Sequence, residues 1–260
     1  MGDFAIITGG AGGLGKAFGF ELAKKGYSTI LIDLPDKGLA SICNEIKNKY
    51  NLNSIFYETD LTKLENIIEI TKNINEKYKV SILINNAGVG GTRRFDDVDI
   101  NYLNTIIQLN VMATTIMIKQ ILPNLQKQGK SYILNVSSIA AFSPVAFKTA
   151  YPASKIYVNF LARGLYEEYK KTNVFISVVN PGPMKTNSEV TARINKLGFW
   201  GKVGLLSPER VAEISVRQLL KRNVLIILNR NRFSWLLLKI VPNWIMLPLF
   251  SRVVRKELKK

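Results

Sequence analysis

The chain has 260 residues, of which 36 are Lys or Arg and 19 are Asp or Glu, so its formal net charge is +17. It contains no histidine, which excludes Ser-His-Asp hydrolases, Cys-His proteases and nearly every catalytic zinc site, because each needs an imidazole. Hydrophobic residues make up 47% of the chain and charged residues 21%, proportions typical of a globular protein and not of a disordered one.

Short apolar runs alternate with amphipathic stretches along most of the chain. Strands are predicted at residues 4–8, 29–33, 54–58, 81–84, 131–136, 174–179 and 224–228. Helices are predicted at residues 14–25, 37–50, 62–78, 102–127, 151–171 and 207–221. Apolar strands that alternate with helices indicate a parallel sheet covered on both faces. The sequence therefore predicts an α/β fold of the Rossmann type, a single domain built on a doubly wound, seven-stranded parallel sheet.

A glycine run, Thr8-Gly9-Gly10-Ala11-Gly12-Gly13-Leu14-Gly15, joins the first predicted strand to the first predicted helix. Glycine lets the chain turn tightly there and lets its backbone approach a pyrophosphate. Two registers fit the run, G-x-G-x-x-G beginning at Gly10 and T-G-x-x-x-G-x-G beginning at Thr8. The second register places a glycine directly after the strand, where the turn must begin, so we prefer it. The run predicts a dinucleotide-binding turn.

Asp33 ends the second predicted strand, 24 residues after Gly9. A carboxylate at this place can accept hydrogen bonds from a ribose and would repel a 2′-phosphate. Neither the glycine run nor Leu34 supplies the Arg or Lys that a 2′-phosphate requires. The sequence thus favours NAD over NADP as cofactor. The alternative interpretation is that Asp33 belongs to an Asx turn before Pro35.

Tyr151 and Lys155 lie four residues apart near the start of a predicted helix, so their side chains share a face. An ammonium group beside a phenol lowers its pKa, which lets the tyrosine exchange a proton near neutral pH. Ser138 lies 13 residues before Tyr151, at the carboxyl end of the fifth strand, where its hydroxyl can hydrogen-bond the same substrate oxygen. A second pair, Tyr166 and Lys170, is interpreted as a solvated helix face.

Together these motifs resemble the short-chain dehydrogenase/reductase family, in the branch whose chains are about as long as this one. The resemblance covers residues 4–228. The matching residues are Thr8-Gly9-x-x-x-Gly13-x-Gly15, Asp60, Asn85-Asn86-Ala87-Gly88, Asn110, Ser138, Tyr151-x-x-x-Lys155, and Pro181-Gly182 followed by Thr186.

The resemblance implies a catalytic tetrad. In such a tetrad, Tyr151 is the general acid and base, and Ser138 orients and polarises the substrate carbonyl. Lys155 holds the nicotinamide ribose and lowers the pKa of the tyrosine. Asn110 helps to hold a water molecule that connects Lys155 to solvent. The alternative for Asn110 is a buried amide inside a helix.

The resemblance also implies a set of cofactor contacts, with Asp60 at the adenine, Asn86 and the turn after it at the adenosine ribose, and Thr186 near the nicotinamide carboxamide. The implied cofactor-binding residues are Thr8, Gly9, Gly13, Leu14, Gly15, Asp33, Asp60, Leu61, Asn86, Ala87, Gly88, Tyr151, Lys155, Pro181, Gly182 and Thr186. The alternatives are an Asx cap for Asp60 and a simple turn at residues 86–88. No metal ligand is implied.

Residues 1–230 are predicted to form the dinucleotide-binding and catalytic domain, with a substrate lid at residues 184–206. The lid is rich in apolar residues, which either line an apolar substrate site or pack on the sheet. Residues 231–260 are predicted to form a hydrophobic and basic tail. The segment 201–260 holds 13 basic and 3 acidic residues, a net charge of 13 − 3 = +10. A basic bias confined to one segment indicates a partner for that segment and not a nucleic-acid groove.

The tail contains an apolar stretch, Phe233 to Phe250, that Pro242 divides into two predicted half-helices. Lys239 and the prolines make a membrane span unfavourable, so a position in the membrane interface fits better. Packing on the chain's own core or on a second subunit stays open. The tail also resembles those of family members that reduce 3-oxoacyl-CoA or act on steroids. A single cysteine, Cys43, and a start without an export signal indicate the cytoplasm, with a peripheral position on the inner face of the membrane.

The sequence therefore predicts an NAD-dependent oxidoreductase that interconverts an alcohol and a carbonyl, on a small, apolar, lipid-like substrate. One alternative is a soluble 3-oxoacyl-carrier-protein reductase or a sugar or polyol dehydrogenase. Another is a nucleotide-sensing protein that binds the cofactor without turnover. The family resemblance implies a homo-oligomer paired through helices 102–127 and 151–171. No nucleic-acid partner is expected.

Overall fold

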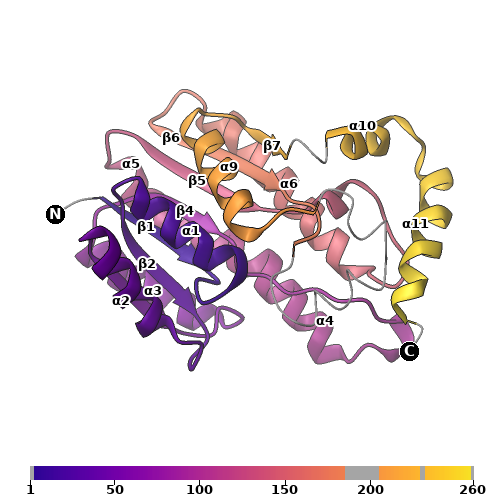
Figure 1. The fold of residues 1–260 in the computed structure, drawn as a ribbon, viewed down its shortest axis with the longest axis horizontal. Helices are drawn as coiled ribbons and strands as arrows, with labels where there is room; N and C mark the ends of the chain where they lie inside the picture. Colours follow the sequence, from indigo (N-terminus) through magenta and orange to yellow (C-terminus); the bar gives the residue numbers. More distant parts are fainter. Residues whose placement is uncertain (1–2, 185–204, 229–231, 259–260) are drawn as a thin grey trace.

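The computed structural model describes residues 3–184, 205–228 and 232–258 of the chain. At its centre lies a seven-stranded sheet in the order β3-β2-β1-β4-β5-β6-β7, with every pair of neighbours parallel (Figure 1). The strands are β1 (Phe4–Thr8), β2 (Ser28–Asp33), β3 (Ser54–Glu58), β4 (Val80–Asn85), β5 (Ser131–Val136), β6 (Val174–Asn180) and β7 (Leu225–Ile227). The predicted fold class is confirmed.

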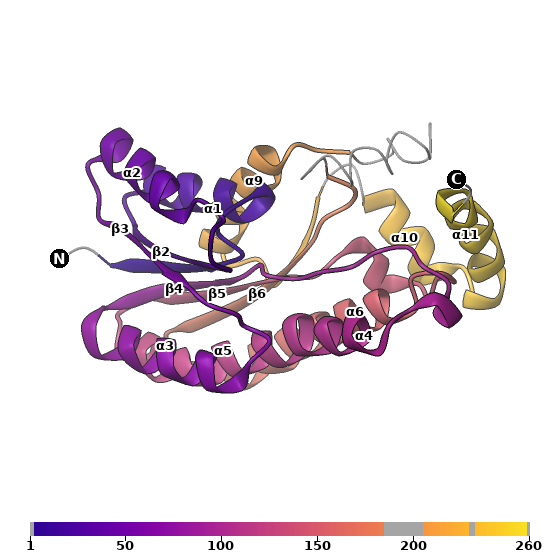
Figure 2. The ribbon, with the colours of Figure 1, turned by 90° about the horizontal axis from the view of Figure 1, so that it is seen from below.

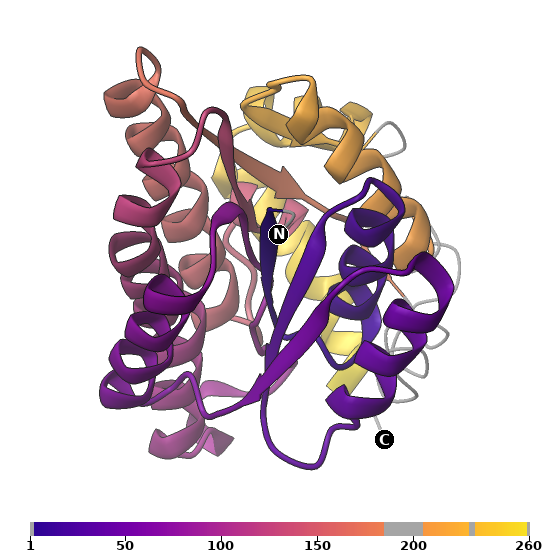
Figure 3. The same cartoon turned by 90° about the vertical axis from the view of Figure 1, so that its left-hand side faces the viewer.

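Helices cover both faces of the sheet (Figures 2 and 3). One layer consists of α1 (Gly13–Lys24), α2 (Leu39–Tyr50) and α9 (Pro208–Leu220). The other contains α3 (Leu64–Lys77), α4 (Ile100–Ile107), α5 (Thr114–Gln126) and α6 (Ala150–Tyr169). Short 3-10 turns, η1 (Phe95–Asp97) and η3 (Ile139–Phe142), lie in the loops after β4 and β5. Ser207 caps α9 by accepting a hydrogen bond from the Arg210 N–H at 3.2 Å, as its place before Pro208 predicts.

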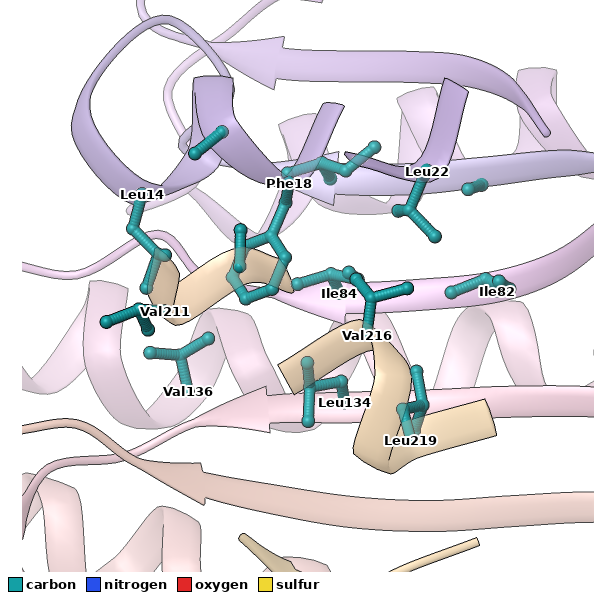
Figure 4. Close-up of a cluster of buried hydrophobic side chains, with 14 of the residues drawn as sticks. Leu14, Phe18, Leu22, Ile82, Ile84, Leu134, Val136, Val211, Val216 and Leu219 are labelled. Carbon is teal, nitrogen blue, oxygen red and sulfur yellow. The ribbon is translucent and has the colours of Figure 1, made fainter. Parts of the chain in front are cut away.

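The strands are apolar toward both layers, so the molecule has a core on each face of the sheet. Figure 4 shows the core between the sheet and the α1–α9 pair, where Phe18 and Leu22 of α1 meet Val216 and Leu219 of α9 over Ile84. All five side chains are fully buried. Burying one such side chain stabilises the fold by about 1.5–3 kcal/mol, so these residues fix how α1 and α9 sit on the sheet.

The connections diverge at the centre of the sheet, because β1 pairs with β2 on one side and with β4 on the other. The chain leaves β1 through α1 toward β2, whereas it leaves β4 toward β5 in the opposite direction. Ligands of open parallel sheets bind where connections diverge in this way, beyond the carboxyl ends of the strands. The loops after β1 and β4 are therefore where a site is expected.

The helix predicted over residues 102–127 is not continuous. A π-helical turn, η2 (Gln108–Ala113), separates α4 from α5. Taken together, residues Ile100–Gln126 are the one described stretch long and apolar enough by composition to cross a membrane. Here they pack on α3, α6 and β4 as part of the helical layer. The predicted lid falls mostly on residues 185–204, which lie outside the described residues.

Two helices follow the last strand, α10 (Arg232–Ile240) and α11 (Asn243–Leu258). They are separated at Val241 and Pro242, as the proline predicts. Figure 2 shows both helices at the end of the molecule opposite the N-terminus, beyond the carboxyl end of β1. The C-terminal helix pair, α10 and α11, thus lies on the same side as the loops where a site is expected. The division of the chain at residue 230 stays a prediction.

Candidate active site

The glycine turn after β1 needs glycine for two different reasons. Gly9 has a φ of +67°, and a Cβ atom there would lie 2.9 Å from the Asn86 Nδ2 atom. A Cβ atom on Gly15 would lie 1.8 Å from the carbonyl oxygen of Gly9, closer than any side chain permits. A Cβ atom on Gly12, in contrast, would meet nothing within 4 Å. Gly13 has a φ of +50°, so all three glycines of the register that begins at Thr8 are constrained. The other register shares Gly15 and contains Gly10, whose Cβ atom would lie 2.9 Å from the Leu31 Cβ atom, but its Gly12 is unconstrained.

Asp33 is tied to the glycine turn through its carboxylate. Its Oδ2 atom accepts a hydrogen bond from the Ala11 N–H at 2.9 Å, and its Oδ1 atom accepts one from the Leu34 N–H at 2.8 Å. The contact with Ala11 is not part of an Asx turn, because it joins the end of β2 to the turn after β1. A half-buried negative charge is therefore held beside the glycine turn.

Thr8 joins the glycine turn to the loop after β4. Its Oγ1 atom accepts hydrogen bonds from the N–H groups of Asn86 and Ala87, each at 3.0 Å. The Asn86 side-chain amide donates in return to the carbonyl oxygens of Thr8 and Gly9, at 3.0 and 3.2 Å. The two strand ends at which the connections diverge are thereby locked together, so the turn at residues 86–88 has a fixed place beside the glycine turn.

Asn110 lies fully buried in the π-helical turn and holds the next part of that loop. Its Oδ1 atom accepts a hydrogen bond from the Val89 N–H, and its Nδ2 atom donates to the Val89 carbonyl oxygen, both at 2.9 Å. Nδ2 also donates to Ser154 Oγ at 2.9 Å. The wider π turn appears where this amide meets backbone groups of a neighbouring loop, a common setting for π turns at functional sites. The helix predicted as continuous over residues 102–127 is interrupted at this contact.

Lys155 is the buried cation of the site. Its side chain extends from α6, and the residue is only 5% exposed. The ammonium Nζ donates to the Val136 carbonyl oxygen at 3.0 Å, and a Cβ atom on Gly88 would lie 3.1 Å from Nζ. Burial disfavours the charged form and lowers the pKa of Lys155 to about 8. The ammonium therefore lies beside the loop that is locked to the glycine turn.

Tyr151 shares a helix face with Lys155, as the spacing predicts. The Lys155 Nζ atom lies 5.9 Å from the centre of the Tyr151 ring. The backbone of Gly90 packs against that ring, and a Cβ atom there would approach the Tyr151 Cδ2 atom to 2.4 Å. Only glycine fits next to the Tyr151 ring at position 90, so the backbone of Gly90 limits the positions that the ring can adopt.

Ser138 follows β5 and caps η3, where its Oγ atom accepts a hydrogen bond from the Ala140 N–H at 3.2 Å. Ser138 thus also has a structural role as the cap of this turn. This role leaves the hydroxyl hydrogen of Ser138 available as a donor, because a hydroxyl both accepts and donates. The turn η3 packs on α6, the helix that carries Tyr151.

The remaining predicted residues divide into four groups. Asp60 forms an Asx cap, since its Oδ1 atom accepts from the N–H and the Oγ1 of Thr62 at 2.9 and 2.7 Å. Leu14 and Leu61 are buried core residues, so any cofactor contact of theirs is through the backbone. Pro181 follows β6, and its carbonyl oxygen accepts from the Ile139 N–H at 2.9 Å, which leaves Gly182 beside η3. Thr186 lies outside the described residues.

The second Tyr-x-x-x-Lys pair has different surroundings. Lys170 is exposed and pairs with Glu167, whose hydrogen bond raises the pKa of the lysine. Tyr166 packs on Phe175 with ring centres 5.7 Å apart. The interpretation as a solvated face is correct for Lys170, but the Tyr166 ring is part of the core boundary, because α6 lies on the sheet there.

Three residues of the site escape the sequence reasoning. Ser137 Oγ donates to the Lys155 carbonyl oxygen at 2.7 Å, and Ser154 Oγ donates to the Tyr151 carbonyl oxygen at 2.8 Å, so both serines fix the start of α6. Gly90 sets the position of the Tyr151 ring. Ser137 and Ser154 were visible as direct neighbours of motif residues, whereas Gly90 has no signal beyond the pair Gly90-Gly91. Within residues 3–184, 205–228 and 232–258, no cluster of Cys, Asp and Glu suits a metal ion.

Comparison with known proteins gives a family and relatives. A family model described as short chain dehydrogenase matches residues 3–196. The very-long-chain 3-oxoacyl-CoA reductase of Mus musculus is 32% identical over 186 residues, which is 70% of this chain and 59% of that protein. The chain thus matches less than two thirds of the length of this relative.

Two solved structures share the fold. The short-chain dehydrogenase of Sphingobium yanoikuyae, in complex with NADPH, has a TM-score of 0.80 at 22% identity and covers 92% of this chain and 96% of its own. The short-chain dehydrogenase/reductase of Burkholderia phymatum, in complex with NAD, has a TM-score of 0.79 at 23% identity and covers 90% and 91%. Proteins of this fold thus bind either nicotinamide dinucleotide.

Proposed function

Because the chain belongs to the short-chain dehydrogenase family, we propose that it interconverts an alcohol and a carbonyl with a nicotinamide dinucleotide as the hydride carrier. One observation supports this most strongly. The buried Lys155 ammonium lies 5.9 Å from the Tyr151 ring and beside Gly88 of the loop that Thr8 joins to the glycine turn. A phenol next to a cation, at the edge of a dinucleotide turn, suits proton exchange coupled to hydride transfer.

The glycine turn fits the pyrophosphate of such a cofactor. No side chain caps the N-terminus of α1, because its N-cap residue is Gly12. The first N–H groups of α1 are therefore available to phosphate oxygens, and the helix dipole favours the negative charge there. When bound, the dinucleotide supplies or accepts the hydride at the substrate carbon.

The residues around the pair have separate tasks in this proposal. Tyr151 passes a proton to or from the substrate oxygen, and Ser138 donates its hydroxyl hydrogen to the same oxygen. Lys155 keeps a positive charge beside the phenol and holds the nicotinamide ribose. Asn110 acts indirectly on Tyr151 and Lys155, because its three hydrogen bonds hold Val89 and Ser154 in place.

For the substrate we infer an apolar, lipid-derived carbonyl, with 3-oxoacyl thioesters as the first class to examine. The curated relative at 32% identity is named as a very-long-chain 3-oxoacyl-CoA reductase. The C-terminal helix pair adds an independent argument, since it presents exposed apolar side chains and its helix α10 packs on η3, the turn that Ser138 caps.

A substrate panel tests the proposed reaction. The wild-type chain is mixed with NADH or NADPH and 3-oxoacyl-CoA thioesters of increasing chain length, and turnover is followed by loss of nicotinamide absorbance. We expect turnover that improves with chain length. Sugars and short polyols, assayed in the oxidative direction, serve as the contrast. Cofactor binding without turnover on any carbonyl would instead indicate a nucleotide-sensing protein.

We propose NAD(H) as the preferred cofactor, because Asp33 holds a negative charge beside the glycine turn and Leu34 next to it is exposed and uncharged. Replacing Asp33→Asn together with Leu34→Arg is expected to move the ratio of kcat/KM values toward NADPH by about tenfold to hundredfold, equivalent to about 1–3 kcal/mol. Asp36→Asn, a nearby exposed carboxylate, is the matched control. A wild-type chain that already prefers NADPH would contradict this proposal.

We also propose that the C-terminal helix pair lies on an anionic membrane surface. Each helix is too short to cross a bilayer, with 9 and 16 residues against the roughly 20 required. Trp244 and Ile240 are 76% and 68% exposed, and Arg232 and Arg252 are exposed nearby in the chain. An apolar face flanked by basic residues is typical of interfacial helices.

Point substitutions test this surface without removing the helices. Ile240→Ser combined with Trp244→Ser is expected to abolish sedimentation with vesicles that contain phosphatidylserine. Leu64→Ser combined with Ile68→Ser, which changes two exposed apolar residues of α3, is expected to leave sedimentation unchanged. Equal vesicle binding of the two double variants would refute the membrane surface. A change of oligomeric state in the first variant would favour a subunit interface for the tail.

For the homo-oligomer we propose pairing through α4 and α6. The exposed apolar side chains there include Phe160, which is 62% exposed, with Tyr157 next to it on α6 and Ile107 on α4. A second copy would cover these side chains and remove their apolar surface from water. Sedimentation equilibrium of Phe160→Lys tests this, with a shift to monomer expected and an unchanged mass contradicting it.

A further inference from the structure

The segment 139–149 joins the two hydroxyl-bearing residues of the site. It begins after Ser138 with the turn η3 and ends two residues before Tyr151. We call residues 139–149 the catalytic segment. Any shift of this segment changes where the Ser138 and Tyr151 hydroxyls stand relative to each other, so whatever holds it in place also sets the geometry of the reaction.

Among the residues that the structure describes, Trp235, Ser251 and Arg255 of the C-terminal helix pair contact the catalytic segment. The rings of Trp235 and Phe142 meet edge to face, with centres 6.4 Å apart and planes at 80°. Ser251 Oγ accepts a hydrogen bond from the Ala146 N–H at 3.1 Å. The Arg255 guanidinium lies 5.6 Å from the centre of the Phe147 ring. Both helices therefore fasten the segment.

The loop after β4 also holds the catalytic segment. The Phe147 carbonyl oxygen accepts a hydrogen bond from the Arg93 N–H of that loop at 2.8 Å. At the end of the segment, the Lys148 carbonyl oxygen accepts a local hydrogen bond from the Tyr151 N–H at 2.9 Å. Phe147 itself has a φ of +68°, in the left-handed region that a bulky residue rarely adopts. Such a conformation persists only when the surroundings determine it, so the contacts with Arg93 and Arg255 at this one residue are structurally significant.

We propose that Ser251 and Arg255, with Trp235, are positioning residues for catalysis: they hold the catalytic segment so that Ser138 and Tyr151 face one substrate oxygen. The proposal rests on the proposed function, and it gives the C-terminal helix pair a role in turnover besides its role at the membrane. None of the three residues touches the substrate in this proposal. Their effect passes through Phe142, Ala146 and Phe147.

Kinetics of single variants test the proposal with acetoacetyl-CoA and NADH as probes and without vesicles. Ser251→Ala and Arg255→Gln are each expected to lower kcat by about tenfold to hundredfold, because small misplacements of reacting groups have effects of this size. The Kd for NADH, followed by fluorescence, is expected to stay unchanged, since the glycine turn is not contacted. Ser251→Thr keeps a hydroxyl acceptor and Arg255→Lys keeps a cation over the ring, so both are expected to recover most of kcat.

The chain offers a matched control for the arginine. Arg222 also lies over a phenylalanine ring, 5.2 Å from the centre of Phe175, but in the turn between α9 and β7. Arg222→Gln removes the same kind of contact and is expected to leave kcat unchanged. A kcat for Ser251→Ala and Arg255→Gln equal to that of Arg222→Gln would overturn the proposal.

Hydrogen exchange separates this inference from the proposed function. In the double variant Ser251→Ala with Arg255→Gln, amide protection of residues 143–151 is expected to fall about tenfold, while that of β1 stays the same. This measurement needs no substrate, so it decides the question even if the wild-type chain turns over none of the carbonyls. Unchanged protection of residues 143–151 would refute the positioning role.

Discussion

The helix α6 carries the same four-residue spacing twice, and its two Tyr-Lys pairs lie in opposite environments. Lys155 is buried against the Val136 carbonyl oxygen, and burial lowers its pKa to about 8. Lys170 is exposed and bound to Glu167, which raises its pKa. The Tyr-x-x-x-Lys spacing alone therefore does not identify a catalytic pair. What distinguishes the first pair is its place at the carboxyl ends of β4 and β5, next to the loop that is locked to the glycine turn.

Exchanging each tyrosine for phenylalanine tests this comparison most strongly. Tyr151→Phe is expected to lower kcat by about 1,000-fold, within the usual contribution of a general acid or base, because only the proton-carrying hydroxyl is lost. Tyr166→Phe keeps its ring contact with Phe175 and is expected to retain full activity. NADH binding, measured by fluorescence, is expected in both. Full turnover of Tyr151→Phe would refute the proposed mechanism.

Replacing Gly90 by alanine tests the surroundings of the first pair, and replacing Gly164 by alanine is the control. Gly90→Ala places a Cβ atom 2.4 Å from the Tyr151 ring, so the ring must move, and kcat is expected to fall about tenfold to hundredfold. Gly164→Ala, inside α6, meets nothing within 4 Å and is expected to stabilise the fold by about 0.5–1 kcal/mol. Steady-state kinetics and urea unfolding give the two results. Normal kinetics for Gly90→Ala would mean that the ring does not depend on this loop.

The two lysines are expected to have opposite effects on the pH dependence of stability. The pKa of Lys155 is about 8 in the folded chain and near 10.5 when unfolded, so between these values the unfolded state binds more protons. The free energy of unfolding of the wild type is therefore expected to rise relative to Lys155→Met by about 3 kcal/mol from pH 8 to pH 10.5.

Lys170 has a raised pKa when folded, so its contribution is present at neutral pH and is lost as the pH rises through that raised value. The free energy of unfolding of Lys170→Met is thus expected to approach that of the wild type at high pH, by a small amount because the pair is exposed. Urea unfolding of the apoprotein from pH 7.5 to pH 11 measures both differences. The difference in free energy of unfolding between the wild type and each variant should change with pH in opposite directions. A change in the same direction for both lysines would contradict burial as the cause of the shift at Lys155.

Most of the fold, and the shared helix face of Tyr151 and Lys155, could be predicted from local sequence motifs. The ranges predicted for β1 and β5 match the structure residue for residue, because each strand is rich in β-branched and aromatic residues, which favour strands. The break between α10 and α11 follows from Pro242. Tyr151 and Lys155 share a helix face because residues four apart must do so, which needs no knowledge of the tertiary structure.

Contacts between distant segments were beyond this reasoning. The π-helical turn at Asn110 has no side-chain pattern of its own, since it depends on the backbone of Val89 on another loop. The packing of Gly90 on Tyr151 joins residues that are 61 positions apart in the numbering (151 − 90), and the hydrogen bond between Ala146 and Ser251 spans 105 positions. Sequence periodicity reports which face of an element is apolar, but it does not report which other element covers that face.

The span between Ala146 and Ser251 has a consequence for the order of events during synthesis. The strands and the glycine turn are complete once β7 has left the ribosome, so a nascent chain can bury its core and acquire its dinucleotide turn at that stage. The contacts from Trp235, Ser251 and Arg255 to residues 142–147 form only after a further stretch of chain has emerged. A nascent chain is thus expected to gain affinity for the cofactor before it gains its full rate of turnover.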